Sequence, residues 1–419
     1  MSTQTSLTID KSRLLSELTT LANFSSCEQP APAVTRVVFS DEDLAAREYL
    51  MSLYEDAGLQ TRVDSVGNTF ARWIGDDDAL PAVGTGSHTD AIPHSGMYDG
   101  TVGVLGGLEA IRVLQRTGFR PRRSIEVLMI TSEEPTRFGI GCTGSRVMAG
   151  RLVESELSDL KDSDGDDFHT VRHRAGFSGD IASAVLSRDY FHAWTELHIE
   201  QGPELESKEL PIGIVTAIAA PASLIVTLTG VGGHAGGVLM PGRRDAMCAA
   251  AEMMHAIEQL AIASPSDDLV ATVGEVDVYP GAVNSIPSKV RFTIDLRDVD
   301  RDSRDQCKSA METQIESIAK RRNIEFDITI VNSDPPATSS PMITAAVEQA
   351  CQASGLAYQR MVSRAYHDSL FMAQVAPMGM IFIPCRNGVS HRPDELTTPE
   401  QLSDGVEVLA RTLATLSMS

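Results

Sequence analysis

Apolar runs that resemble buried strands alternate with helical segments along the first 150 residues, and this alternation restricts the chain to a small set of folds. Residues 124–132 (SIEVLMITS) form a continuous apolar run, which is typical of a strand buried on both faces. A small-residue-rich amphipathic segment precedes it at 100–118, and residues 81–92 predict a strand that ends in polar residues. The pattern predicts an α/β sheet. By contrast, the polar stretch 155–180 predicts an exposed excursion with little core value.

A second pattern occupies residues 215–331. It reads as strand, helix, two strands, helix and strand, which predicts a compact α+β sandwich. The Asp-Pro-Pro sequence that follows marks a return to the first pattern. We therefore predict a mixed-sheet domain built from residues 1–214 and 332–419, with residues 215–331 inserted as a separate domain.

The charge of the chain argues against several classes of partner. Its 419 residues include 35 basic and 57 acidic side chains, for a formal net charge of -22. Phosphate binding needs a basic surface, so nucleic acid is an unfavourable partner, and an anionic membrane is equally unfavourable. No apolar stretch reaches the ~18 residues that a membrane helix needs. The simplest meaning of the charge is solubility.

The cysteines bear on the cellular compartment. All six are scattered, and none forms a CxxC pair. In a chain of this size that spacing is typical of reduced thiols. The N-terminal residues also lack the long apolar region of a secretory signal. We therefore expect a cytoplasmic protein.

Potential metal ligands follow the predicted strands, and strand ends carry the ligand sites of open α/β sheets. Within residues 81–92, His88 follows the apolar run and so lies where the predicted strand ends, and Asp90 is placed to orient its imidazole. Asp99 lies in a glycine-rich loop just before a helix, and its two carboxylate oxygens can bridge two cations. A lone histidine at a strand end is more often structural, so the nearby acidic residues are what favour a ligand here.

Two adjacent glutamates and two further histidines extend the pattern. Glu133 and Glu134 directly follow the apolar run, so one can bind a metal while its neighbour acts as general base. A solvated strand–loop junction is the alternative for such a pair. His198 alternates with apolar residues as on a strand, where a satisfied core histidine is the alternative. His391 follows a predicted strand and a short glycine turn.

Together these residues can hold two divalent ions. His88 and His198 would bind one ion, Glu134 and His391 the other, and Asp99 would be shared. Ions bridged in this way sit ~3.5–4 Å apart and hold a hydroxide nucleophile between them. Because the ligands are nitrogen and oxygen only, zinc, manganese and cobalt all remain possible.

Several strings at these positions resemble a known family. GSHTD, YDG, SEEPTRFG, ELHIEQGP and SHRPDE are similar to the carbamoyl-hydrolysing branch of the aminoacylase-like dinuclear metallohydrolases. That branch includes N-carbamoyl-amino-acid hydrolases, allantoate amidohydrolases and ureidoglycolate amidohydrolases. The resemblance implies the ligand set above, Glu133 as general base, and a cis peptide bond after Asp99. EEPTRFGIGCTGSR and SRAYHDSLFMA are most similar to the ureidoglycolate-hydrolysing members.

The same resemblance implies the substrate contacts and the assembly. It suggests manganese as the metal, and a homodimer formed through the inserted domain, which acts as a lid. His234 would serve the neighbouring subunit's site, and Asp90 and His234 would join Glu133 as catalytic residues. Arg297 is suited to a substrate carboxylate, with a surface salt bridge as the alternative. The implied substrate-contacting residues are Gln201, His234, Asn284, Arg297, Tyr366 and His367.

The function that this resemblance implies is metal-dependent hydrolysis of ureidoglycolate to glyoxylate, ammonia and carbon dioxide in purine catabolism. Hydrolysis of allantoate or of an N-carbamoyl-L-amino acid is the alternative within the branch. A non-catalytic protein on this fold would be expected to lack a ligand or the base, and an aminopeptidase would lack the ureide-type strings.

Overall fold

The computed structural model describes residues 7–27 and 33–419, which divide into two compact units. Unit 1 comprises Met1–Thr216 and Thr338–Ser419, and unit 2 comprises Ala217–Ala337. The insertion expected at 215–331 therefore starts two residues and ends six residues before the observed one. The larger difference arises at the C-terminal side, where the last strand of unit 2 continues to Ser333.

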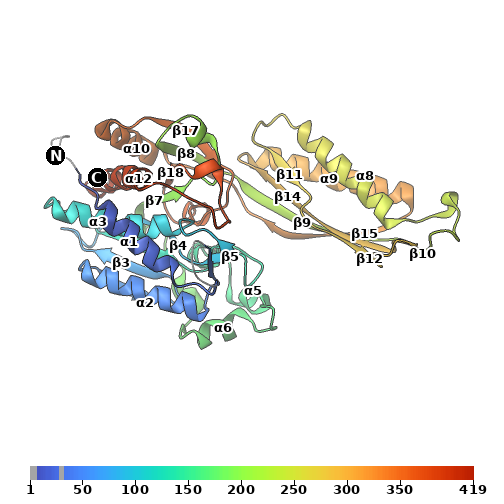
Figure 1. Ribbon diagram of the computed structural model, residues 1–419, viewed down its shortest axis with the longest axis horizontal. Coiled ribbons are helices and arrows are strands. Elements are labelled where there is room, and N and C mark those ends of the chain that lie inside the picture. Colours follow the sequence, from blue (N-terminus) through green and yellow to red (C-terminus); the bar gives the residue numbers. More distant parts are fainter. Residues whose placement is uncertain (1–6, 28–32) are drawn as a thin grey trace. The chain divides into compact units, whose positions relative to one another are not determined.

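A nine-stranded mixed sheet forms the centre of unit 1 (Figure 1). Its strands are β2 (Gln60–Val63), β3 (Thr69–Trp73), β4 (Ala82–His88), β6 (Ile125–Ile130), β7 (Phe191–Ile199), β8 (Ile212–Ile218), β16 (Ala337–Thr338), β17 (Tyr358–Ser363) and β18 (Met378–Ile383). The order is β16-β8-β18-β7-β4-β6-β3-β2, and β17 also pairs with β8. The central strands β18, β7, β4 and β6 are parallel, whereas β8, β3 and β2 pair antiparallel. A separate ribbon pairs β1 (Val34–Arg36) with β5 (Ala91–Ser95).

Five helices pack with this sheet around the main apolar core. They are α1 (Lys11–Ala22), α2 (Asp41–Asp56), α3 (Thr101–Arg116), α10 (Pro341–Ser354) and α12 (Pro399–Ser417). The small residues of α3 allow the helix to approach the strands closely. A Cβ at Gly103 would lie only 2.7 Å from the Ser87 Cβ and from the Leu197 carbonyl oxygen. Helix α2 packs beside β2.

Residues 155–180 are largely exposed, as expected, but the segment also has a small core of its own, so the expectation of little core value is wrong. It contains α5 (Glu154–Asp159), α6 (Phe168–Arg174) and the 3-10 turn η1 (Ile181–Ala184), and it follows α4 (Thr143–Met148). Leu157, Phe168 and Val171 are buried in one cluster with Phe39 and Phe138. The Phe168 ring makes edge contacts with both of those phenylalanines. A few large side chains at helical spacing thus suffice to bury one face of a mostly polar segment.

Unit 2 is a five-stranded antiparallel sheet packed with two long helices (Figure 1). Its elements are β9 (Ala220–Thr229), β10 (Gly233–His234), α8 (Ala246–Ile262), β11 (Val270–Thr272), β12 (Val276–Tyr279), β13 (Ser285–Ile286), β14 (Lys289–Asp298), α9 (Arg301–Arg322) and β15 (Glu325–Ser333). The sheet order is β11-β14-β9-β15, with β12 also paired with β14 and with β10 and β13 forming a separate ribbon. Alternate residues of β9 and β14 point into the core between sheet and helices.

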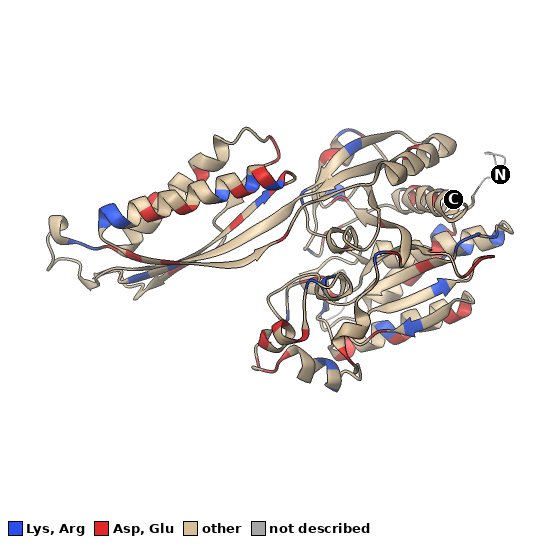
Figure 2. Cartoon of the chain, turned by 180° about the vertical axis from the view of Figure 1, so that it is seen from behind, with Lys and Arg blue, Asp and Glu red and all other residues tan. Residues whose placement is uncertain are grey.

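Acidic residues are spread over helices and loops of both units, with basic residues among them (Figure 2). Within residues 7–27 and 33–419, no helix combines the length and the apolar character that crossing a bilayer requires. All six cysteines are free thiols.

Candidate metal centre

The parallel strands of unit 1 bring the expected ligands to one edge of the sheet. His88 is the last residue of β4, and His198 lies one residue before the end of β7. The pair Glu133-Glu134 follows β6, and His391 follows β18 after the 3-10 turn η3 (Arg386–Gly388). Asp99 lies in the loop between β5 and α3. Because the carboxyl ends of parallel strands meet at the same edge, residues far apart in the chain converge here.

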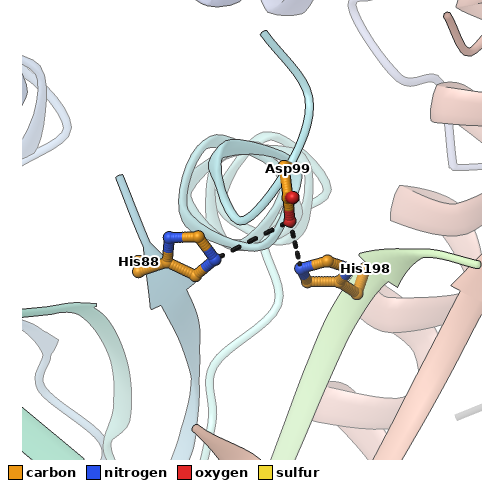
Figure 3. A group of neighbouring side chains, drawn as sticks. All are labelled: His88, Asp99 and His198. Atoms are coloured by element: carbon orange, nitrogen blue, oxygen red, sulfur yellow. Dashed lines mark ion pairs between the residues drawn. The ribbon is translucent and has the colours of Figure 1, made fainter. Parts of the chain in front are cut away.

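The carboxylate of Asp99 lies between two sets of imidazole nitrogens. Its Oδ1 is 3.2 Å from His198 Nε2 and 3.8 Å from His88 Nε2 (Figure 3). Its Oδ2 is 3.1 Å from His391 Nε2, which in turn is 3.3 Å from Glu134 Oε1. Two groups of potential ligand atoms, each within 4.8 Å of one another, therefore share Asp99. This donor set of nitrogen and oxygen fits two divalent ions with one bridging carboxylate.

Hydrogen bonds to backbone carbonyls orient two of the imidazoles. His88 Nδ1 lies 3.0 Å from the carbonyl oxygen of Asp90, and His198 Nδ1 lies 2.9 Å from the carbonyl oxygen of Ile199. A carbonyl oxygen only accepts, so each Nδ1 carries a hydrogen and donates it. Each Nε2 is then left to face Asp99, where it can hold a metal ion.

The Asp90 carboxylate has a different role from the expected one. It lies 3.7 Å from His88 Nδ1, farther than the carbonyl oxygen of the same residue, so the carbonyl and not the carboxylate orients the imidazole. Its two oxygens accept the backbone N–H groups of Glu133 and Glu134 at 3.2 and 3.0 Å. Burial, together with the charge of Asp43, raises the pKa of Asp90 to about 7. Asp90 therefore holds the glutamate pair in place.

Charge interactions favour a cation between Asp99 and the histidines. Burial alone would raise the pKa of Asp99, but hydrogen bonds from His198 and His391 hold it well below its usual range. The hydrogen bonds to Asp99 and Glu134 raise the pKa of His391 to about 10. Burial would lower the pKa of His198, but the hydrogen bond and charge of Asp99 outweigh it and raise the value to about 9. Protons or metal ions can satisfy this buried carboxylate.

Glu133 has the surroundings of a general base. It is buried, and its Oε2 lies 3.8 Å from His88 Nε2. The thiol of Cys142 donates to its Oε1 at 3.5 Å. Burial, and then the charge of Glu134, raise the pKa of Glu133 well above its ordinary value. A carboxylate whose pKa is raised binds a proton more readily than an ordinary glutamate, as a general base requires.

Two of the three expected substrate contacts in unit 1, Gln201 and His367, lie against the ligands. Gln201 Nε2 donates to Asp99 Oδ2 at 3.0 Å, and among the described residues its buried Oε1 has no hydrogen-bond partner. The ring of His367 is buried and packs edge-on against His198, with 4.5 Å between ring centroids. Tyr366 lies behind the site, where its hydroxyl accepts from Arg146 Nη2 at 2.5 Å.

The three expected contacts in unit 2 do not lie together. His234 and Asn284 are neighbours beside the β10–β13 ribbon, because the backbone N–H of Ala235 donates to the carbonyl oxygen of Asn284 at 2.9 Å. This ribbon precedes the start of β14 at Lys289, whereas Arg297 is near the other end of that strand. Eight residues of strand span ~26 Å at ~3.3 Å per residue. Arg297 itself forms a fork with Asp295, at 2.7 and 3.2 Å.

Backbone geometry at the site departs from expectation in one respect. In the described part of the chain the cis peptide is Tyr279-Pro280, so the cis bond expected after Asp99 is wrong. Gly100, with φ of 66°, makes the turn into α3 with a trans bond, which avoids the cost of a non-proline cis peptide. Strained backbone occurs instead at Gln201 and His391, whose φ angles are 55° and 58°.

Sequence reasoning did not assign roles to several residues that surround the ligands. Glu196 forms a third ligand-type group with His198 and His367. It accepts from Ser87 Oγ at 2.6 Å and also from Ser369. Its position on β7, two residues before His198, was the available signal, because alternate strand residues share a face. Ser390 and Glu395 also contact the Asp99 loop, and both lie in the SHRPDE string that includes His391.

Comparisons with known proteins identify the family of the chain. The model of peptidase family M20/M25/M40 matches residues 75–415. The ureidoglycolate hydrolase of Arabidopsis thaliana is 49% identical to this chain, and the match covers 99% of this chain and 88% of that protein. An N-carbamoyl-L-amino acid amidohydrolase of Geobacillus stearothermophilus is 38% identical, and the match covers 92% of this chain and 94% of that protein. The crystal structure of AtUAH in complex with (S)-hydroxyglycine is 48% identical, with a TM-score of 0.88 over 98% of this chain and 99% of that one. The chain therefore belongs to peptidase family M20/M25/M40, as a hydrolase with ligands for divalent metal.

Proposed function

We propose that this hydrolase converts ureidoglycolate to glyoxylate, ammonia and carbon dioxide. The observation that carries the proposal is the Asp99 carboxylate shared by two ligand groups, with the buried Glu133 beside it. The relatives that support the substrate are named ureidoglycolate hydrolase, and the similar AtUAH was solved with (S)-hydroxyglycine and with glyoxylate. The allantoate amidohydrolase of Bacillus subtilis, at 33% identity, represents the alternative substrate class.

The proposed centre holds two ions. His88 and His198 would bind one, Glu134 and His391 the other, and Asp99 would bridge them. Manganese is the metal that we propose, although the same nitrogen and oxygen ligands also suit zinc or cobalt. When bound, the ions would lower the pKa of a water molecule and polarise the carbonyl oxygen under attack.

In this proposal Glu133 moves the proton. It takes a proton from the attacking water, whose oxygen adds to the ureido carbonyl carbon. As the C–N bond breaks, Glu133 returns the proton to the leaving nitrogen. The products are hydroxyglycine and carbamate. Carbamate decays to carbon dioxide and ammonia, and hydroxyglycine loses ammonia to give glyoxylate.

Gln201 and Arg297 are proposed to hold the substrate. The buried Oε1 of Gln201 is an acceptor without a partner among the described residues, so a ureido N–H would satisfy it. A substrate carboxylate would replace Asp295 as the partner of the Arg297 fork. Tyr366 and His367 would act from behind, where they pack near Arg146 and His198.

The separation within unit 2 supports a homodimer. Because ~26 Å of strand lies between the Asn284–His234 end and Arg297, one copy of unit 2 cannot bring all three to one small substrate. A second copy, related by two-fold symmetry, would supply His234 and Asn284 to its neighbour's site. We propose that this dimer forms through unit 2, which would act as a lid. The six free thiols support a cytoplasmic location.

The direct test compares substrates on one preparation. Metal-stripped protein reloaded with manganese or zinc is assayed in parallel with ureidoglycolate, allantoate and N-carbamoyl-alanine. We expect the largest kcat/KM for ureidoglycolate with manganese. Preference for either other substrate would overturn the assignment of substrate while leaving the metal chemistry in place.

Replacing the proposed base should separate chemistry from metal binding. Glu133→Gln keeps the size of the side chain but cannot take a proton, so kcat should fall by about 10²–10⁴-fold. Metal content, measured by mass spectrometry, should stay at the wild-type value. Glu55→Gln, an exposed glutamate of α2, is the matched control and should behave as wild type. Activity of Glu133→Gln within tenfold of wild type would refute its role.

Metal binding should release protons. His198 and His391, with pKa values of about 9 and 10, are protonated at pH 7 in the metal-free protein, so an ion must displace those protons. Metal affinity should therefore rise as the pH increases from 6 to 9. The stability that the two charged histidines give the metal-free protein is present below pH 6.5 and is lost as the pH rises through 9 to 10.

Calorimetric titration in buffers of different ionisation enthalpy measures this proton release. The variant His391→Gln should release fewer protons than wild type. His255→Gln, on an exposed face of α8, should leave the proton count unchanged. Affinity that does not vary with pH, with no protons released, would contradict the proposed ligand set.

Mixing two inactive variants tests the shared site. Glu133→Gln lacks the base and His234→Ala lacks the residue proposed to act across the dimer. In a hybrid dimer one site has both intact residues and the other has neither. An equimolar, re-equilibrated mixture should recover about a quarter of wild-type activity if the dimer is two-fold symmetric. No recovery, with hybrid dimers demonstrated by native mass spectrometry, would place His234 in its own subunit's site or outside any site.

A further inference from the structure

We propose that Glu395 is a positioning residue that sets the orientation of the Asp99 carboxylate. It touches neither the substrate nor an ion in this account, and it acts through the backbone of residues 98–99 and through the hydroxyl of Ser390. The inference rests on the proposed metal centre, since its effect is exerted on the carboxylate that the two ligand groups share.

The carboxylate of Glu395 is fully engaged with the Asp99 loop. Its Oε1 accepts the backbone N–H groups of Tyr98 at 2.8 Å and of Asp99 at 3.1 Å. Its Oε2 lies 2.8 Å from the Ser390 hydroxyl. The side chain is buried, so water does not compete for these bonds. A buried carboxylate that accepts several hydrogen bonds fixes the groups that donate them.

Ser390 extends this arrangement to the side chain of Asp99. Its Oγ lies 3.0 Å from Asp99 Oδ2, and Gln201 Nε2 lies 3.2 Å from Ser390 Oγ and 3.0 Å from Asp99 Oδ2. The Ser390 hydroxyl has one hydrogen, which it donates to Asp99 Oδ2 or to Glu395 Oε2 at any one time, so the permanent tie is that of the Asp99 backbone to Glu395, with the Ser390 oxygen held between the two carboxylates. Rotation of the Asp99 carboxylate would break these bonds.

The local backbone is shaped around the Glu395 carboxylate. A Cβ placed at Gly96 would collide with the Cβ, Cδ and Oε1 atoms of Glu395. Glycine at this position therefore allows the loop before Asp99 to close on the carboxylate. Glu395 follows His391 by four residues, so it joins the loop of one ligand to the loop of another almost 300 residues away in the chain.

Orientation matters because the two oxygens of Asp99 have different neighbours. Oδ1 faces His88 and His198, and Oδ2 faces His391. Turning the carboxylate would leave one ligand group without its shared oxygen. Residues that hydrogen-bond to metal ligands change metal affinity by about 10–100-fold when they are replaced. Glu395 should therefore control how tightly the pair of ions binds.

The test uses Glu395→Met, which keeps the length of the side chain and removes both acceptors. Manganese affinity is measured by chelator competition, and electron paramagnetic resonance distinguishes paired from isolated ions. We expect affinity for the pair to fall by about 10–100-fold, with loss of the paired-ion signal. Glu395→Gln, which retains an oxygen for the two backbone N–H groups, should recover most of the wild-type affinity.

Two further variants keep the result interpretable. Asp394→Asn alters the exposed neighbour, which pairs with Arg392, and should bind the ions as wild type does. Ser390→Ala removes the hydroxyl that lies between Glu395 Oε2 and Asp99 Oδ2, together with its contact to Gln201 Nε2, so it carries the test if Glu395→Met fails to fold. It should also weaken binding of the pair. Wild-type affinity in both Glu395→Met and Ser390→Ala would overturn the inference and leave the proposed function intact. A wild-type protein that binds no ion pair would overturn both.

Discussion

The structure of the site depends on one buried carboxylate whose two oxygens face different imidazoles. Asp99 Oδ1 is directed at His88 and His198, and Oδ2 is directed at His391. A carboxylate removed from water is costly unless cations and hydrogen bonds compensate it. The histidines follow or end parallel strands of the sheet, and this places them close to Asp99. There they can compensate the charge of the buried carboxylate.

The surrounding residues show how such a cluster is held in one geometry. Buried carboxylates near the ligands accept backbone or hydroxyl hydrogens and so fix the loops that carry the ligands. Asp90 holds the Glu133–Glu134 loop, and Glu395 holds the Asp99 loop. Glu196 similarly links β7 to Ser87 and Ser369. Each acidic residue beside the site has donors of its own, which keeps the ligands in place without relying on a flexible side chain.

Much of this arrangement could be predicted from sequence, because strand ends and ligand types are local features. The α/β class and the convergence of His88, Asp99, Glu134, His198 and His391 follow from apolar runs that end in polar residues. The partner that a given carboxylate selects depends on loops that meet only in three dimensions. Asp90 was therefore expected at an imidazole and bonds to backbone N–H groups.

Two other differences have the same origin. The core of residues 155–180 depends on contacts between Phe168 and two rings outside the segment, Phe39 and Phe138. Contacts between residues so far apart in sequence cannot be read from the composition of the segment. The distance between Asn284 and Arg297 follows from the length of β14 in an antiparallel sheet. The sequence motifs that contain these residues give no information on that length. Resemblance identified both residues but gave no information on how far apart one chain holds them.

The most direct measurement of the central claim is anomalous X-ray diffraction from crystals of the manganese-loaded protein. Two peaks ~3.5–4 Å apart are expected, one on each side of the Asp99 carboxylate. The first should lie against His88 and His198, and the second against Glu134 and His391. A single peak, or peaks that do not touch Asp99, would contradict the claim that this carboxylate is shared between two ions.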